Sequence, residues 1–237
     1  NFLIVENPRL TFQKILKKFF SQKKSAKIEA SSKIDTSVKV GKGTYIGHNV
    51  VIEEECSIGI DCEIMHNTVI LKNTKIGDRV RIGSNCTIGN FGFGYEKNES
   101  EDYELIEHLG HVVISNDVHV HNNTCIDRGV LGRTFIGENV KIDNLVQIAH
   151  GVHIGRNSLI IANAMVAGSV KIGENSWIAP STSIKNQLEI SAGTLTGIGA
   201  VVLKSSMKND VLIGSPATTM EEYKKWSLVK KKLLDQK

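Results

Sequence analysis

An aliphatic β-branched residue recurs every sixth position along most of this chain, and this period limits the folds that are open to it. The series occupies residues 28–88, returns over 114–126 and runs again over 136–190. It has 24 members, of which 21 are Ile and three are Val. A six-residue period held over so much of a chain predicts a solenoid of one repeated strand and turn.

The other positions of each six-residue repeat indicate how the strands turn. The fifth position is small or β-branched, and Gly often follows the aliphatic anchor. Large and small inward residues describe a short strand followed by a tight corner, and three such units close one triangular coil. Gly and Asn can supply the positive φ of the corners. We expect about eight coils stacked around a continuous Ile column.

The period breaks twice, and functional residues often lie at such breaks. From Ile88 to Ile114 the spacing is 26 residues, which is not a multiple of six, so the segment between them must leave the prism as a loop. From Ile126 to Ile136 the spacing is ten, which predicts a four-residue bulge within residues 127–135.

Both ends of the chain also leave the period. Apolar residues recur at helical spacing in residues 8–20 and again after residue 218. Thr219 and Glu222 have the spacing of a capping box, which predicts a helix start there. We therefore divide the chain into an N-terminal helical segment (1–27), a β-helix (28–217) and a basic C-terminal helix (218–237).

Charge is divided between these parts. The 237 residues carry a net charge of +4, with hydrophobic residues at 41% and charged residues at 23%, as in a globular protein. Residues 1–27 hold seven Lys or Arg and one acid, whereas residues 28–203 hold 14 basic and 20 acidic residues. An acidic body with basic ends does not suggest a nucleic-acid groove. It would suit a local anionic partner, and a solvated charge run is the alternative.

The lack of a recognisable targeting signal and the positions of the cysteines together predict a cytoplasmic protein. No apolar run approaches the roughly 20 residues of a membrane span, and the start lacks the features of a secretory signal. Cys56, Cys62 and Cys86 occupy the small interior position, while Cys125 lies one position later. Four thiols without a disulfide framework or a CxxC pair favour a reducing compartment. Because the chain begins with Asn1, one expectation is that it is a fragment of a longer product.

Among the eight histidines, His150 has the most polar surroundings in the sequence. His48, His66 and His150 are all third in their repeats, where a side chain points outward near a corner. Only His150 has Asp143, Asn144 and Gln147 at near-coil spacing, with the bulge of 127–135 about one coil earlier. A polar cluster beside a displaced loop predicts a pocket.

Several motifs resemble one family of hexapeptide-repeat enzymes. "GFGY", "IDRG", "IDNLVQIAH", "AGSVKIG" and "GSPA" occur in that order. Together they resemble the UDP-3-O-acylglucosamine N-acyltransferases of lipid A biosynthesis. The resemblance covers nearly the whole chain and implies a left-handed parallel β-helix with flanking helices. Within it, residues 7–20 resemble the last helix of a uridine-binding domain, of which residues 1–27 would be the remnant.

The resemblance also implies roles for residues. His150 of "QIAH" corresponds to the general base, and the backbone N–H of Gly168 corresponds to the oxyanion donor. Residues of the motifs and of the polar cluster would bind the substrate: Phe93, Tyr95, Asp127, Arg128, Asp143, Asn144 and Gln147. His153 is expected to be structural. Gln187 stands where the family often has a second histidine, and His108 stands where it usually has Gln.

We therefore expect an N-acyltransferase that acts on a nucleotide-linked amino sugar, with acyl carrier protein or coenzyme A as the acyl donor. The basic side chains of Lys230, Lys231 and Lys232 would contact the anionic donor. The resemblance implies a homotrimer, no bound metal and no covalently bound cofactor.

Three alternatives remain open on sequence alone. An acetyl-CoA-dependent N-acetyltransferase of surface polysaccharide synthesis would share the repeat. A zinc carbonic anhydrase on the same prism would need three histidines from adjoining subunits, drawn from His119, His121, His150 and His153, whose spacing does not resemble that family. A purely structural prism would leave "DNLVQIAH" and both breaks of the period unexplained.

Overall fold

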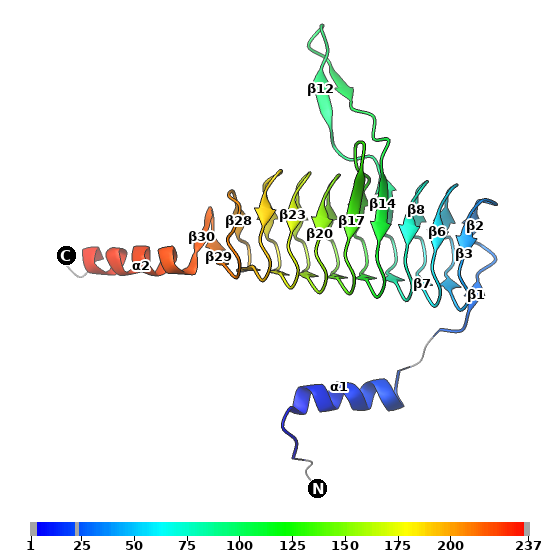
Figure 1. The fold of residues 1–237 in the computed structure, drawn as a ribbon, viewed down its shortest axis with the longest axis horizontal. Helices are drawn as coiled ribbons and strands as arrows, with labels where there is room; N and C mark the ends of the chain where they lie inside the picture. Colours follow the sequence, from blue (N-terminus) through cyan, green and yellow to red (C-terminus); the bar gives the residue numbers. More distant parts are fainter. Residues whose placement is uncertain (1–3, 22–23, 235–237) are drawn as a thin grey trace.

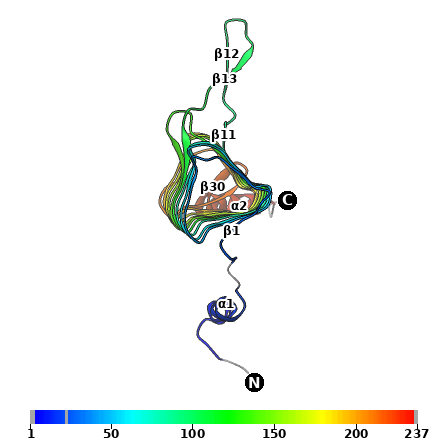
Figure 2. The same ribbon diagram turned by 90° about the vertical axis from the view of Figure 1, so that its right-hand side faces the viewer.

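The computed structural model describes residues 4–21 and 24–234. Most of them form a parallel β-helix whose coils stack along one long axis (Figure 1). Seen along that axis, the coils superpose as a triangle (Figure 2). The prism predicted from the six-residue period is thus confirmed. Residues 1–3 and 22–23 of the N-terminal segment, and 235–237 of the C-terminal segment, lie outside the described residues.

Each side of the triangle is a sheet of short strands from successive coils, and we call these sheets walls A, B and C. Wall A contains β1 (Lys27–Ile28), β4 (Tyr45–Ile46), β7 (Glu63–Ile64), β10 (Arg81–Ile82), β15 (His119–Val120), β18 (Lys141–Ile142), β21 (Leu159–Ile160), β24 (Trp177–Ile178), β27 (Leu195–Thr196), β29 (Val211–Gly214) and β30 (Ala217–Thr219). Wall B contains β2 (Lys33–Ile34), β5 (Val51–Ile52), β8 (Val69–Ile70), β11 (Thr87–Asn90), β16 (Cys125–Asp127), β19 (Gln147–Ile148), β22 (Met165–Val166), β25 (Ser183–Ile184) and β28 (Val201–Val202). Wall C contains β3 (Lys39–Val40), β6 (Ser57–Ile58), β9 (Lys75–Ile76), β14 (His111–Ile114), β17 (Arg133–Ile136), β20 (His153–Ile154), β23 (Lys171–Ile172) and β26 (Glu189–Ile190).

The core of the prism is the column of aliphatic anchors. Strands pair in parallel so that anchor lies beside anchor, as Ile46 does with Ile64 and Ile148 with Val166. From Ile46 to Ile190 the anchors of the described coils are buried. The fifth-position residues fill the corners inside, and Cys56, Cys62 and Cys86 are all buried there.

The corners require a left-handed backbone, and the fourth position of the repeat supplies it. Asn is the residue most often found there with positive φ, as at Asn49 (56°) and Asn157 (57°). Asn tolerates this region better than most residues with a side chain. Leu145 adopts the same conformation (φ 60°) at the corner that precedes β19.

The prism is longer than the period predicts, with about ten turns. After Ile190 the inward positions are taken by Thr196, Val202 and Leu212, which are 1%, 1% and 6% exposed. Thr and Leu are not the aliphatic β-branched anchors of the period, and the step from Val202 to Leu212 is ten residues. These turns therefore extend the buried core of the prism, although they lack the six-residue repeat of Ile and Val.

Both breaks of the period occur next to wall B. Residues 91–110 leave the prism after β11 and carry the antiparallel hairpin of β12 (Tyr95–Lys97) and β13 (Tyr103–Leu105). The hairpin projects far beyond the triangular outline (Figures 1 and 2). The predicted bulge is the segment 128–132, between the end of β16 at Asp127 and the start of β17 at Arg133. A separate register shift lies in β11 itself, between Ile88 and Asn90.

Two helices flank the prism, as expected. Helix α1 (Pro8–Phe19) begins at Asn7, whose side chain accepts a hydrogen bond from the Leu10 N–H. Helix α2 (Met220–Leu234) follows β30, and the predicted capping box is present: Thr219 Oγ1 accepts from the Glu222 N–H, while the Thr219 N–H donates to Glu222 Oε2. Within the described residues, neither helix has the length and apolar character to cross a membrane.

Candidate active site

Half of the predicted site residues line one pocket of about 600 Å³ on wall B, beside its corner with wall C. Strand residues form its floor, and the start of the long loop forms one side. Its lining consists of Asn90, Phe91, Gly92, Phe93, Tyr95, Leu105, Asp127, Gln147, Ala149, His150, Met165, Ala167 and Gly168.

His150 lies at the corner immediately after β19 and is half-buried. Burial lowers the pKa of His150 below its ordinary 6.5, because a desolvated imidazolium is disfavoured. A positive charge on the neighbouring His108 would lower this pKa further. At neutral pH the ring is therefore uncharged, as a group that must accept a proton requires.

Gly168 lies directly against the imidazole. A Cβ atom built on Gly168 would be only 2.6 Å from Nε2 and 2.6 Å from Cε1 of His150. Real Cβ atoms do not approach other atoms this closely, so only Gly leaves room for the ring in this position. The sequence places these residues 18 positions apart, and the coil period brings them into contact.

The backbone at Gly168 also offers a hydrogen-bond donor. Its carbonyl accepts from the Gln187 N–H of the next coil (2.9 Å), and the following residue, Ser169, donates to the His150 carbonyl (2.9 Å). Within the described part of the chain, the Gly168 N–H makes no hydrogen bond. A free N–H beside an imidazole is the pair of groups that acyl transfer needs, a proton acceptor and an oxyanion donor.

Asp127 and Gln147 form a polar pair on the floor of the pocket. The Gln147 side chain donates to Asp127 Oδ2 (2.8 Å). Asp127 is 9% exposed, and burial raises its pKa to about 7. This carboxyl can therefore change its charge near neutrality, which an exposed Asp cannot do.

Phe93 and Tyr95 border the pocket from the loop side. Their ring centroids are 5.0 Å apart, and Phe93 is 90% exposed. An aromatic side chain so exposed at the edge of a pocket is available to a ligand.

Three other predicted substrate-binding residues lie outside this lining. Asp143 Oδ1 accepts from the backbone and side chain of Asn144 (both 2.8 Å), and its Oδ2 accepts from the Ala162 N–H (3.2 Å). Asn144 in turn accepts from the Asn122 N–H (3.0 Å). Both residues tie together neighbouring coils at the corner between walls A and B, and neither bonds to His150.

Arg128 is the third predicted substrate-binding residue that lies outside the pocket lining. It is 3% exposed, and its Nε donates to the Gly89 carbonyl (2.6 Å) behind the loop. Its guanidinium lies 5.5 Å from the centre of the Phe91 ring, and Arg128 lines a neighbouring hollow rather than the pocket of His150. Arg128 therefore supports the loop within this chain.

His108 is a residue of the site that the sequence did not single out. It belongs to the long loop, yet it is 1% exposed, and its ring centroid lies 5.3 Å from that of His150. The loop has no period from which burial could be predicted. The available signal was the resemblance, in which His replaces the usual Gln at this position.

The remaining predicted residues lie elsewhere. Lys230, Lys231 and Lys232 are on helix α2, which extends from the end of the prism (Figure 1), whereas His150 is in a middle coil. His153 is on wall C, where its Nε2 bonds to the Arg133 carbonyl (3.1 Å). His119 is on wall A, where burial lowers its pKa to about 4. Among the residues that the structure describes, no group of three or more His, Cys, Asp or Glu could hold a metal ion.

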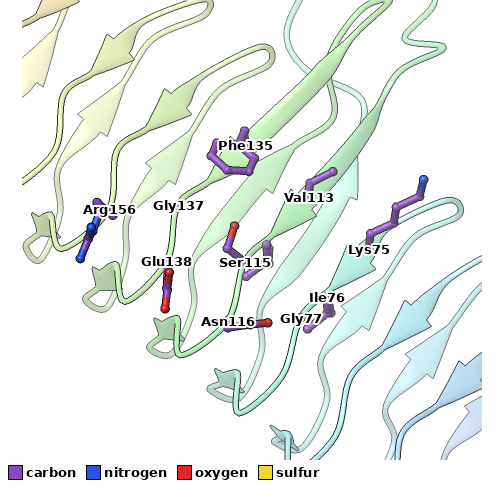
Figure 3. A pocket seen from close by; sticks show the side chains of 11 residues that line it. Lys75, Ile76, Gly77, Val113, Ser115, Asn116, Phe135, Gly137, Glu138 and Arg156 are labelled. Carbon is purple, nitrogen blue, oxygen red and sulfur yellow. The ribbon is translucent and has the colours of Figure 1, made fainter.

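A second hollow of about 600 Å³ lies on wall C (Figure 3). Val113 and Phe135 form an apolar floor, and the charged side chains of Lys75, Glu138 and Arg156 lie around it. It contains no imidazole and no buried carboxyl. We therefore place the candidate chemistry in the pocket of His150.

Comparison with known proteins finds a family of repeat-containing enzymes and several similar proteins. The family model "Bacterial transferase hexapeptide (six repeats)" matches residues 55–90 and 133–168, the second of which includes His150 and Gly168. UDP-3-O-acylglucosamine N-acyltransferase 2 of Legionella pneumophila is 39% identical over 138 residues, which cover 58% of this chain and 40% of that protein. The UDP-3-O-acylglucosamine N-acyltransferase of Caulobacter is 37% identical over 136 residues, or 57% of this chain and 40% of that protein. The matches thus span about two fifths of the length of these relatives.

Solved structures show the same fold. The UDP-N-acetylglucosamine O-acyltransferase of Moraxella catarrhalis superposes with a TM-score of 0.74 over 81% of this chain and 73% of its own, at 22% identity. The LpxA structure from Acinetobacter baumannii gives the same TM-score, coverage and identity. The chain is therefore a hexapeptide-repeat protein with a left-handed parallel β-helix, and it resembles the UDP-3-O-acylglucosamine N-acyltransferases in sequence.

Proposed function

We propose that this protein is an N-acyltransferase that moves an acyl group from a thioester to the amine of a nucleotide-linked amino sugar, UDP-3-O-acylglucosamine in lipid A biosynthesis. The observation that carries the proposal is the contact between His150 Nε2 and Gly168 in a pocket of about 600 Å³. The similarity to curated N-acyltransferases, over 138 and 136 residues of this chain, supports the same activity.

The reaction follows from these two groups. The amine nitrogen attacks the thioester carbonyl carbon, and His150 Nε2 accepts the proton that the amine loses. The Gly168 N–H donates to the negatively charged oxygen of the tetrahedral intermediate. When the C–S bond breaks, His150 returns the proton to the leaving sulfur. A positioned base contributes about 10²- to 10⁴-fold, and one oxyanion donor about 10²- to 10³-fold.

The donor would be an acyl thioester of acyl carrier protein or coenzyme A, both of which carry phosphate. The exposed lysines of helix α2 supply complementary charge. Since these lysines are far from His150 in one chain, the donor would have to extend along the prism or meet helix α2 of another copy.

A homotrimer is part of the proposal. The hollow on wall C has an apolar floor within a charged rim, as a surface that receives another copy of the chain would have (Figure 3). Flat walls packed around a threefold axis would place the pocket of one copy beside a wall of the next. Sedimentation that shows a stable monomer at micromolar concentration would contradict this assembly.

The test of the function is a product assay. Purified protein is incubated with UDP- and dTDP-linked amino sugars and with acyl and acetyl thioesters of both carriers, and products are identified by mass. We expect an amide product from a UDP-linked amino sugar, with the fastest rate for UDP-3-O-acylglucosamine. Products from acetyl thioesters and other nucleotide sugars alone would redirect the function to polysaccharide N-acetylation. Transfer by His150→Ala at the wild-type rate would refute the mechanism.

A further inference from the structure

The carboxyl group of Asp127 lies on the floor of the pocket without a positively charged partner. Asp127 is 9% exposed, and it lines the same pocket as His150. Its Oδ2 accepts a hydrogen bond from the Gln147 side chain (2.8 Å), which is a neutral amide. Within the described part of the chain, no Lys, Arg or His forms an ion pair with it. Carboxyl groups buried to this extent are nearly always paired with a cation, so this one calls for an explanation.

The protein groups nearest to this carboxyl do not supply the missing positive charge. Arg128 follows Asp127 directly in the chain, but its Nε donates to the Gly89 carbonyl (2.6 Å) and its side chain lines a neighbouring hollow. Burial lowers the pKa of His150, so its ring is uncharged at neutral pH. The thiol of Cys125, on the same strand, could only add negative charge. A ligand in the pocket can bring the positive charge that the protein does not provide.

One oxygen of the Asp127 carboxyl is available to such a ligand. Oδ2 bonds to Gln147, whereas no residue that the structure describes bonds to Oδ1. Among the described residues, the one fully buried side-chain nitrogen or oxygen without a partner belongs to His108, so the unbonded Oδ1 keeps some accessible surface. Because Asp127 is part of the pocket lining, a ligand in the pocket can reach this oxygen.

The register of the strands places this carboxyl close to the candidate base. Strands β16 and β19 pair in parallel, with Ile126 beside Ile148. The residues that follow, Asp127 and Ala149, are therefore neighbours across a strand spacing of about 4.8 Å. His150 comes directly after Ala149, and all three of these pocket residues lie along the same edge of wall B. A group held by Asp127 thus lies in the same part of the pocket as the imidazole.

We propose that Asp127 selects the acceptor of the reaction: its carboxylate binds the amino group of the sugar as an ammonium ion, so the site takes an amine in preference to a hydroxyl group. The inference rests on the proposed N-acyltransferase activity. An amine is mostly protonated at pH 7 and supplies the positive charge that the pocket lacks, whereas a hydroxyl group is neutral. A hydrogen bond between two charged groups is about twice as strong as one between neutral groups.

The ammonium must lose two protons before the amide is complete, and the pocket offers an acceptor for each. The first passes to the Asp127 carboxylate, which becomes a neutral acid and leaves the amine with a free lone pair. Burial raises the pKa of this carboxyl to about 7, which is within about one unit of an ordinary α-amino group, so the transfer costs little. The amine then attacks the thioester carbonyl carbon, and its second proton goes to His150. Asp127 releases its proton to water when the product leaves.

Two probes that differ at a single group test this selection. UDP-glucosamine has an amine on the second carbon of the sugar, where UDP-glucose has a hydroxyl group. Calorimetry at pH 7 should show that wild-type protein binds UDP-glucosamine about 10- to 100-fold more tightly than UDP-glucose. Asp127→Asn keeps the shape of the side chain but removes its charge, so it should bind the two probes within about threefold of each other. Asp117→Asn, whose carboxylate pairs with Arg79 on another corner, is the control and should keep the wild-type preference. A preference that Asp127→Asn retains, or one that wild type lacks, would overturn the proposal.

Titration of the Asp127 carboxyl by ¹³C NMR is a second readout, which needs neither turnover nor a folded variant. In free wild-type protein the pKa should be about 7, and UDP-glucosamine should lower it while UDP-glucose should not. A pKa near the ordinary 3.8 in the free protein, or the same response to both probes, would overturn the inference. The proposed function is judged separately: an amide product that wild type forms and His150→Ala does not would leave it standing, even if Asp127 proves not to select the acceptor.

Discussion

Two corners of the prism carry histidines at the third position of the repeat. The histidines at one corner differ from the histidine at the other in their hydrogen bonds and in their surroundings. His48 and His66 lie one coil apart at the corner between walls A and B, with stacked rings 5.4 Å apart. His48 Nδ1 is 3.0 Å from the Ser31 hydroxyl, and His66 Nδ1 accepts from the His48 N–H (2.9 Å). His150 lies at the corner between walls B and C, and its ring forms no hydrogen bond to any residue that the structure describes.

The difference comes from the breaks in the period. The corner of His48 and His66 is flanked only by regular coils, so the rings face solvent or each other. The corner of His150 lies beside the long loop, which places Gly92 and His108 against it and reduces its contact with water. A regular solenoid thus supplies many equivalent positions, and an insertion makes one of them chemically distinct.

The largest expected effect separates the two corners directly. His150→Ala should lower kcat by about 10²- to 10⁴-fold, because it removes the proton acceptor. His66→Ala is the matched control and should retain nearly full activity. Steady-state kinetics, with thermal melts to confirm that both proteins are folded, would make the comparison. Comparable losses in both variants would erase the distinction between the corners.

Gly168→Ala tests how tightly the base is placed. The new Cβ would lie 2.6 Å from Nε2 of His150, so the ring must move. A misplacement of about 1 Å can reduce a rate by about 10²-fold, and we expect a loss of that order in kcat. Gly132→Ala, where a Cβ would meet nothing within 4 Å, is the control and should change little.

The acid limb of the pH–rate profile sharpens the comparison further. Burial depresses the pKa of His150, so the base stays uncharged to a lower pH than an ordinary imidazole. The log of kcat/KM should fall by about one unit per pH unit, with its inflection below 6.5. Because the folded-state pKa is lowered, this group also contributes stability above the unfolded pKa that is lost as pH falls through the folded one. An inflection above 6.5 would contradict the burial seen here.

Asp127→Asn tests, through the pH dependence of Tm, whether the carboxyl on the floor of the same pocket is desolvated. The pKa of Asp127 is raised to about 7, so its contribution is fully present below the unfolded pKa of 3.8 and is lost as pH rises through about 7. Wild-type Tm should therefore decline between pH 5 and 8, and Asp127→Asn should recover about 1 to 3 kcal/mol at pH 8.

Asp117→Asn is the control with the opposite sign. The hydrogen bond from Arg79 lowers the pKa of Asp117, so its contribution to stability is lost only as pH falls below the ordinary range. This variant should retain the wild-type decline of Tm between pH 5 and 8. If Asp127→Asn shows the same decline, the carboxyl is not desolvated as described.

The smallest effect concerns helix α2, remote from both corners. Reversing the charge of Lys230, Lys231 and Lys232 should raise KM for the acyl donor several-fold and weaken its salt dependence, because surface attraction is screened over about 8 Å at physiological ionic strength. kcat should not change. If the donor KM and its salt dependence match those of wild type, helix α2 does not take part in donor binding.

The sequence predicts most of the prism because the residues at each sixth position are the ones that pack in its interior. Each anchor must be apolar, and each fourth residue must tolerate positive φ. The final turns escape prediction because Thr196 and Leu212 fill the inward position with other residue types.

The site is predictable in part. The resemblance identifies His150 and Gly168, and the structure brings them into contact. Arg128, the first residue after β16, is instead buried, and its Nε donates to the Gly89 carbonyl. The burial of His108 follows from the path of a loop that has no period, and no local rule of sequence specifies such a path.

The long loop also has a bearing on how the chain finds its fold. In regular coils, corner residues bond to partners 18 positions away, as Asn49 does to Asn67, whereas across the loop Arg79 reaches Asp117, 38 positions away. Loop-closure entropy grows only with the logarithm of length, so this doubling adds about 0.6 kcal/mol. Coils that form on one side can therefore propagate to the other with little delay. The prism can therefore assemble whatever the length of the hairpin tip at residues 98–102, whereas Tyr95 and Leu105 at its base line the pocket.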